Sequence, residues 1–550
     1  MKGKVIFSAS AGVLAAAIAG LVPISQGADE PLPAFLDPAR LAAASCGRAP
    51  AGSLMKSWSA RIAAITPALA PPAAARTADD APPLWEGTGN AHFPISSKVE
   101  RAQSYFNQGL RLVYGFNHWE AIRAFRAAQK LDPDCAICYW GEALALGPNI
   151  NAPMQPATLD DALALVRKAK ERAKSASPEE QALISALEVR YDAAEGAERA
   201  DLDLAYAEAM KKVHERFPDN PDIASLYAEA IMDTSPWDYW ESDFRTPKPP
   251  IATAIGAVEK VLAANPDHMG AIHLYIHLME ASAMPDKAEP YADKLAAIAP
   301  GLGHLVHMPG HIYFRIGRYL DSLETNKRAV AQDSAYLDAT EGSDIYRFGY
   351  YPHNVHFVLV SAALAGDGPT ALDAGTSLDR LMPYEILEQV AWTQPVKAAP
   401  YFVQLQFGDP KSVLAIEEPP AHLPLLRGLW HYARGVAHAL EGNAAGARQE
   451  AEAIHALRED PGVLALPDQG VPAPGMLKIA ELVVSARADR VQKRHETAVS
   501  KLQEAAKEQR ALAYMEPPFW YYPVEQTLGA TLLEMGRHQE AADAFSRSLR

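Results

Sequence analysis

Apolar side chains follow a single spacing over most of this chain. From about Ser97 to the end they recur every three or four residues, which is typical of amphipathic helices. Runs with the alternation expected of a strand are lacking. Residues 28–96 differ: they are rich in Pro and Ala, as in "PALAPPAAARTADDAPP", and we expect an extended segment there. The pattern predicts an all-α protein.

Small residues and prolines divide the helical part into units of similar length. In "YFNQGLRLVYGFNHWEAIRAFRAAQKLDPD" the small, aromatic and proline residues at relative positions 8, 20, 24, 27 and 32 are Gly109, Ala121, Phe125, Ala128 and Pro133. This pattern resembles the tetratricopeptide repeat, a helix-turn-helix unit of about 34 residues. Further matches to the same frame are Ala254 with Pro266, Ala288 with Pro300, Gly310 with Tyr313, Gly317 and Ala329, Gly366 with Ala371, Gly435 with Gly442 and Ala447, Ala486 with Ala498 and Ala505, and Gly529 with Gly536, Ala541 and Phe545.

The resemblance covers most of residues 97–550 and implies a right-handed α-solenoid of stacked hairpins. We expect the first units in 97–147, irregular helical hairpins in 148–250, histidine-rich units in 251–381 and C-terminal units in 382–550. The last unit ends at Arg550, near relative position 29, before its capping helix. Either another subunit caps it or the natural chain continues.

Histidines are concentrated in the units between 251 and 381. The stretch "HLVHMPGH" spaces three of them by three and four residues, so that they share one helix face. The resemblance implies that positions 2, 5, 9 and 12 of each first helix line a concave groove. In three consecutive units these positions hold His273, His277 and Glu280, then His304, His307 and His311, then His353 and His356. The repeat positions were assigned from Gly, Ala and Pro residues and not from histidines. The concentration of histidines at these positions is therefore an independent observation.

Imidazole is the commonest transition-metal ligand, and two histidines four residues apart on a helix can share an ion. Glu280 supplies a carboxylate for a mixed site. Copper, zinc, iron or manganese suits such ligands, whereas calcium prefers oxygen. A single histidine on a helix is more often structural, as we expect for His431 and His438 at packing positions. Seven imidazoles on one face need a metal, an anion or a water-filled cavity, because burying them without partners is costly.

Other residues around the histidines are candidates for ligand binding. Pro309 is expected inside a helix, where it would kink the chain and re-aim the flanking histidines. Arg315, at groove position 13, suits an anion or a substrate carboxylate. Aromatic and amide side chains beside His353 suit the wall of a pocket for an organic ligand, and they are Tyr350, Tyr351 and Asn354.

These features predict a solenoid that binds transition metal. If the metal site is catalytic, the protein is a metalloenzyme of unknown reaction. The main alternative is a metal-free scaffold that binds a protein or peptide in the groove, which is the commonest role of the family that the chain resembles. A third is pH-dependent binding of a small molecule, because close imidazoles repel one another when protonated. Nucleophile motifs, phosphate loops and nucleotide fingerprints are lacking, so the sequence leaves catalysis open.

Charge and the N-terminus bear on the compartment. The net charge of -16 argues against nucleic-acid binding, which needs a basic surface. Lys2 and Lys4 precede an apolar run from Val5 to Ile24 and then small residues, which is the pattern of a secretory signal peptide over residues 1–27. A retained membrane anchor is the alternative, and no later segment is apolar enough to span a bilayer. We therefore expect export to a bacterial periplasm.

Three cysteines occur in the chain. In an oxidising compartment Cys135 and Cys138 are candidates for a disulfide, which leaves Cys46 without an assigned partner. A redox or metal role for the pair is the alternative. Tyr139, in place of histidine, follows Cys138, which excludes a c-type haem attachment motif.

Overall fold

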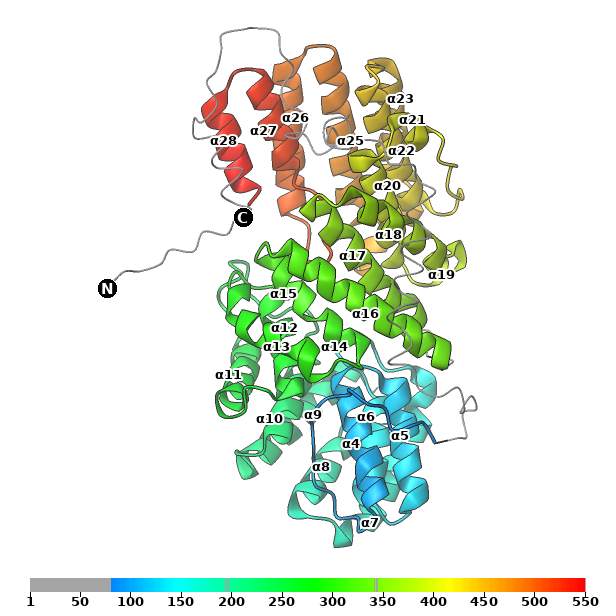
Figure 1. Ribbon diagram of the computed structural model, residues 1–550, viewed down its shortest axis with the longest axis vertical. Helices are drawn as coiled ribbons and strands as arrows, with labels where there is room; N and C mark the ends of the chain where they lie inside the picture. Colours follow the sequence, from blue (N-terminus) through cyan, green and yellow to red (C-terminus); the bar gives the residue numbers. More distant parts are fainter. Residues whose placement is uncertain (1–80, 193, 195–196, 341, 343–344, 550) are drawn as a thin grey trace, which may run out of the picture. The chain divides into compact units, whose positions relative to one another are not determined.

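A computed structural model describes residues 81–549 except 193, 195–196, 341 and 343–344. Regular structure in these residues is helical, with two isolated β-bridges, Asn149 to Ala152 and Trp240 to Pro247. Most of the helices form antiparallel pairs joined by short turns (Figure 1). The predicted all-α class with tetratricopeptide-like hairpins is confirmed.

The chain divides after residue 381 into two units. The unit that contains the histidine-rich helices comprises α4 (Glu100–Tyr114), α5 (His118–Leu131), α6 (Ala136–Leu146), η4 (Pro156–Thr158), α7 (Leu159–Arg172), η5 (Ala173–Ser175), α8 (Pro178–Glu188), α9 (Arg199–Arg216), α10 (Pro221–Met232), α11 (Pro249–Ala264), α12 (Met269–Glu280), η6 (Pro285–Ala288), α13 (Glu289–Ile298), α14 (Gly303–His307), α15 (Pro309–Arg315), α16 (Tyr319–Ala339), η7 (Tyr346–Tyr350), α17 (Tyr351–Ala365) and α18 (Gly368–Leu381).

The second unit is built in the same way. It comprises α19 (Tyr384–Gln389), α20 (Thr393–Phe407), α21 (Pro410–Leu414), α22 (Pro424–Leu440), α23 (Ala444–Arg458), α24 (Pro461–Leu464), η8 (Leu466–Gln469), α25 (Ala473–Val491), α26 (His495–Arg510), α27 (Val524–Glu534) and α28 (His538–Arg547). Among the described helices of both units, none is both long and apolar enough to cross a membrane.

The small residues of the repeat frame lie where neighbouring helices approach closely, and they leave space for larger side chains. A Cβ atom on Gly109 would lie 2.5 Å from Cε1 of Phe125, and one on Gly141 would lie 2.4 Å from the same atom. The fully buried Phe125 ring on α5 therefore occupies space left by glycines on α4 and α6. Such contacts stack one hairpin on the next, because a side chain at either glycine would separate the helices.

The expectation that Pro309 interrupts a continuous helix is corrected. Helix α14 ends at His307 and α15 begins at Pro309, so the proline occupies the first position of a new helix. A proline is tolerated there, because its missing N–H would have no helical partner in the first turn. Two short helices, set apart by Met308, therefore carry His304, His307 and His311.

Three of the sequence predictions concern the segment before residue 81, and the extended segment expected over residues 28–96 lies outside the described residues up to residue 80. The signal peptide over residues 1–27 and the partner of Cys46 lie outside the described residues. Cys135 and Cys138 are described, and they are joined in a disulfide at the start of α6.

Candidate metal centre

The eight predicted ligand residues lie together in the first unit, but they are buried and do not line an open groove. Seven of them are at most 3% exposed, and His353 is half-buried. Aromatic side chains from other segments cover them, among them Phe116 in the turn between α4 and α5. The groove prediction was wrong in this respect, because the repeat frame gives the face of a helix and not what packs against it.

Six of the histidines form two sets of three, each with one ligand nitrogen per residue and all three nitrogens within 4.8 Å of one another. We call the first set triad A, and it consists of His273, His277 and His304. We call the second set triad B, and it consists of His307, His311 and His353. Helix α14 supplies one histidine to each triad, α12 supplies the rest of triad A, and α15 and α17 complete triad B. The imidazole ring centroids of His304 and His307 are 6.0 Å apart, so the triads are adjacent.

Hydrogen bonds fix which nitrogen carries the proton in two imidazoles of triad A, those of His273 and His277. Nδ1 of His273 lies 2.7 Å from the carbonyl oxygen of Tyr114. A carbonyl only accepts, so this Nδ1 donates and the lone pair is on Nε2. That lone pair faces Nε2 of His304 at 3.1 Å. Nδ1 of His277 donates to Glu280 at 2.6 Å, and its Nε2 is buried without a hydrogen-bond partner among the described residues.

Triad B repeats this arrangement, with Asn326 and again Glu280 as the acceptors. Nδ1 of His307 donates to Oδ1 of Asn326 at 2.5 Å. The amide orientation is set by Nδ2 of Asn326, which donates to the carbonyl of Ser322 at 2.7 Å. Nδ1 of His311 donates to Glu280 at 2.5 Å. Both Nε2 atoms therefore carry lone pairs, and they face each other at 2.7 Å, with Nε2 of His353 a further 3.4 Å from His311.

Glu280 orients one imidazole of each triad. Its two carboxylate oxygens accept from Nδ1 of His277 and Nδ1 of His311. Burial acts to raise the pKa of this carboxyl, but His311 and His277 together lower it well below its usual range. Glu280 was predicted as a ligand. The structure places its oxygens on the outer nitrogens of the imidazoles, where a carboxylate fixes the tautomer and raises ligand basicity.

Each triad has its own phenylalanine, which contacts all three of its imidazoles. The centroid of the Phe116 ring lies 4.5, 5.8 and 5.5 Å from those of His273, His277 and His304. In triad B, Phe357 on α17 lies 4.8, 4.6 and 5.1 Å from His307, His311 and His353 in the same way. These rings exclude water and surround the nitrogen ligands with an apolar wall.

Two of the aromatic residues at triad A have a strained backbone. Phe116 has a φ of 53° and Trp237 a φ of 67°, in the left-handed region that bulky residues avoid. Trp237 lies edge-on to His277, with ring centroids 5.3 Å apart. Each such residue costs about 1–3 kcal/mol and persists where the surroundings enforce it, often at functional sites.

Burial keeps the imidazoles neutral. It lowers the pKa of all the triad histidines for which a shift is resolved, and it does so strongly for His273, His304, His307 and His353. Neighbouring histidines lower these pKa values further, because two nearby imidazolium ions repel each other. Neutral imidazole is the form that binds a metal ion.

Several other predicted residues lie close by but outside the triads. His356 follows His353 by one turn on α17, and its pKa is lowered to about 3 by burial. Arg315 donates to the backbone carbonyls of Glu280 and Ser282, so it holds the end of α12. The ring of Tyr350 is tilted against the imidazole of His304, with the ring centroids 4.7 Å apart. Tyr351 is half-buried.

Asn354 belongs to a separate buried polar group, which also contains Asp333 and Tyr346. Its amide donates to Asp333 at 2.6 Å, and the hydroxyl of Tyr346 donates to the other oxygen of the same carboxyl at 2.6 Å. Burial raises the pKa of Asp333 to about 7 against these two hydrogen bonds. The amide nitrogen of Asn354 is therefore engaged inside the protein, and its predicted contact with a bound ligand stays a prediction.

Asn326 is the residue that the sequence prediction missed despite a visible signal. It occupies repeat position 24 of its unit, which elsewhere holds Phe125 or Phe545, and Ser322 occupies position 20, which elsewhere holds alanine. Polar residues at two packing positions beside histidines indicate a hydrogen-bonded interior. Phe116 and Phe357, by contrast, gave no signal, because apolar residues are expected throughout the core.

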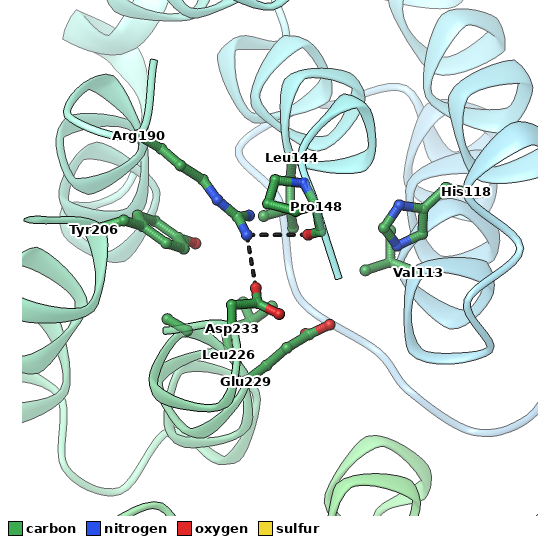
Figure 2. Close-up of a pocket in the computed structure, with 10 residues that line it drawn as sticks. Val113, His118, Leu144, Pro148, Arg190, Tyr206, Leu226, Glu229 and Asp233 are labelled. Carbon is green, nitrogen blue, oxygen red and sulfur yellow. Dashed lines mark hydrogen bonds and ion pairs between the residues drawn. The ribbon is translucent and has the colours of Figure 1, made fainter. Parts of the chain in front are cut away.

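A second buried polar cluster lies in the same unit (Figure 2). The guanidinium of Arg190 donates to Asp233 at 2.7 Å and to the carbonyl of Pro148 at 3.0 Å. Burial raises the pKa of Asp233 and of Glu229, one turn away on α10, although Arg190 opposes both shifts. His118 lines the same small cavity, and burial lowers its pKa to about 4. The sequence prediction assigned this cluster no role.

Comparisons with known proteins give little beyond the fold. No protein-family model matches the chain, and no curated protein matches it. Solved structures with a similar arrangement include the Cut9–Hcn1 hetero-tetramer of the APC/C, at 12% identity over 82% of this chain and 76% of that one, with a TM-score of 0.31. Yeast Tom70 matches at 10% identity over 80% of this chain and 89% of its own, with a TM-score of 0.30. Similarity at this level says nothing about function, and the fold assignment depends on the helical hairpins themselves.

Proposed function

We propose that this protein binds transition-metal ions at triads A and B. The supporting observation is the direction of the imidazole lone pairs. Nε2 of His307 and Nε2 of His311 both lack protons, because both Nδ1 atoms donate to oxygen, yet they face each other at 2.7 Å. Two acceptors cannot form a hydrogen bond with each other, so a cation between them relieves the repulsion.

The nitrogen separations suit coordination to one ion in each triad. Zinc–imidazole bonds of about 2.1 Å in tetrahedral geometry place the nitrogens about 3.4 Å apart. The Nε2 atoms of His273 and His304 are 3.1 Å apart, and those of His311 and His353 are 3.4 Å apart. The closer pair in triad B needs to separate by less than about 1 Å. Neutral imidazoles suit zinc, copper and iron, and copper and zinc bind most tightly to such ligands.

Outer hydrogen bonds support metal binding over simple packing. In metal sites a coordinating imidazole almost always donates its other nitrogen to a carboxylate, carbonyl or amide oxygen. Four of the six triad imidazoles do so here, to a backbone carbonyl, to Asn326 and to both oxygens of Glu280. A packed core of histidines has no need for this uniform orientation.

The test is the metal content of the full-length chain by plasma mass spectrometry. We expect two equivalents of copper or zinc in the wild type, one in His273→Ala/His304→Ala and one in His307→Ala/His311→Ala. His431→Ala is the matched control, since His431 also donates to a carboxylate but belongs to no triad. Wild-type protein without metal after reconstitution with each ion, or variants with unchanged metal content, would overturn the proposal.

Export is part of the same proposal. The signal-peptide pattern of residues 1–27 and the disulfide between Cys135 and Cys138 both suit an oxidising compartment such as a bacterial periplasm. Cell fractionation, with N-terminal sequencing of the mature protein, tests this. Cleavage near Gly27 is expected, and full-length protein in the cytoplasm would contradict it.

A further inference from the structure

A small cavity in the first unit is lined by no triad histidine (Figure 2). The centre of a water molecule can occupy about 10 Å³ of it, which is the room that a single ordered water needs. The polar side chains that line it come from different elements, and they are His118, Arg190, Tyr206, Glu229 and Asp233. A cavity of this size with polar walls suits one water molecule and excludes an organic ligand.

The acidic groups at this cavity are not all matched by cations. Arg190 donates to Asp233 at 2.7 Å, and Arg199 lies 2.9 Å from a carboxylate oxygen of the neighbouring Asp203. Glu229 is only 9% exposed, and among the described residues the cation that acts on it is Arg190, which already binds Asp233. A buried carboxylate without a cation of its own takes up a proton, because its charge is costly away from water.

Two further polar atoms at the cavity lack partners. Oδ2 of Asp233 accepts from Arg190, but Oδ1 of the same carboxylate is buried without a hydrogen-bond partner among the described residues. The hydroxyl of Tyr206 is buried in the same way. Glu229 and Asp233 are one helical turn apart, and Figure 2 shows their carboxyl groups on the same side of α10. One water molecule, which makes two to four hydrogen bonds, can reach several such atoms.

The other titratable groups that face Glu229 supply no positive charge near pH 7. Burial lowers the pKa of His118, which comes from α5, to about 4. Burial raises the pKa of Tyr114 on α4, of Tyr206 on α9 and of Tyr239 in the loop after α10, and Glu229 acts in the same direction. Among the described residues, α11 and α12 also pack against α10 but add no charge that acts on Glu229.

We infer that Glu229 holds a proton at neutral pH and shares it with Asp233 through one ordered water molecule in this cavity. The carboxyl O–H of Glu229 donates to the water oxygen, and the water donates to Oδ1 of Asp233 and to the hydroxyl of Tyr206. Arg190 remains the partner of the ionised Asp233. The cavity is thus a proton-binding site that needs no metal ion, so it stands or falls separately from the proposed function.

The test is the pH dependence of the folding equilibrium of the full-length protein in chelator, measured by urea titration. Burial and the charge of Asp233 raise the pKa of Glu229 above its ordinary value of 4.5. The unfolded chain therefore ionises first, and the folded state loses stability as the pH rises above that value. Relative to Glu229→Gln, the folding constant of the wild type should fall by nearly 10-fold per pH unit between about pH 5.5 and 7. The triad histidines cancel, because both proteins keep them.

Glu142→Gln is the matched control. Glu142 is also buried in the first unit, but it accepts from Arg126 at 2.6 Å and from Gln129 at 2.7 Å. Its substitution should leave the wild-type pH dependence unchanged. Glu229→Met, a second uncharged side chain of similar length, keeps the test independent of whether one substitution folds. The same pH dependence in the wild type and in either Glu229 variant would overturn the inference.

A bound monovalent cation is the competing way to balance Glu229. Exchange of sodium or potassium chloride for choline chloride at constant ionic strength should leave the stability of the wild type unchanged. Stability that requires sodium or potassium would overturn the inference in favour of a cation site. A high-resolution crystal structure should show one water within hydrogen-bond distance of both Glu229 and Asp233, and a dry cavity would overturn the shared arrangement.

Discussion

Two histidine–glutamate pairs, one in each unit, are joined by the same kind of hydrogen bond but have different neighbouring residues. In the second unit Nδ1 of His431 donates to Glu450 at 2.6 Å, as Nδ1 of His277 donates to Glu280 at 2.6 Å in the first. Glu450 also accepts from the guanidinium of Arg434 at 2.8 Å. The second partner of Glu280 is another imidazole, that of His311.

The difference teaches that a histidine–carboxylate pair does not by itself mark a metal site. At Glu450 a permanent cation balances the carboxylate, and His431 is half-buried. At Glu280 two imidazoles are oriented together, and their Nε2 atoms point toward further histidines. Convergence of several lone pairs is the property that distinguishes the first unit.

Acidification should separate the two regions most strongly. Burial lowers the pKa of four triad histidines, so the unfolded chain binds more protons than the folded one as the pH falls below about 6.5; they are His273, His304, His307 and His353. The free energy of unfolding of metal-free protein should therefore decrease by about 1.4 kcal/mol per pH unit for each histidine that stays neutral. Urea titrations in chelator at pH 7.5 and 5.5 measure this. Equal stability at both values would contradict neutral buried imidazoles.

Glu280→Gln should lower metal affinity at both triads. An amide has one acceptor oxygen in place of two, so one of His277 and His311 loses its partner, and the other loses the negative charge of its acceptor. Loss of such outer contacts lowers affinity by about 10–100-fold. Competition with a chromogenic chelator measures the change. Glu450→Gln is the control, and an equal effect of the two substitutions would remove the distinction between the regions.

Asn326→Ala should affect triad B alone. It removes the acceptor of His307 Nδ1–H, while the hydrogen bonds of triad A remain. We expect affinity for one of two ions to fall by about 10-fold, toward the lower end for outer contacts. Titration calorimetry of wild type and variant resolves the two binding steps. A matching loss at the second ion would mean that the triads do not bind independently.

His356→Gln should have the smallest effect on metal binding. His356 lies one turn from His353 but belongs to neither triad. We expect unchanged stoichiometry and less than about a threefold change in affinity, since only the surroundings of a ligand are altered. Loss of one equivalent in this variant, with circular dichroism unchanged, would show that triad B includes a fourth imidazole.

The sequence alone determined the helical hairpins and the concentration of histidines. Residues such as Gly109 and Phe125 lie at repeat positions where packing demands their size, so a spacing along the chain was enough to predict the contact. The same frame correctly gave His273, His277, His304, His307 and His311 one shared region, because helical periodicity fixes the face of a side chain.

Tertiary structure alone decided how these histidines are divided and oriented. The turn holding Phe116 and the loop holding Trp237 come from distant segments, and no local spacing predicts that they cover triad A. The role of Glu280 likewise depends on which nitrogen of each imidazole reaches it across helices. Periodicity along a chain fixes direction within one helix, whereas proton positions and burial depend on contacts between helices.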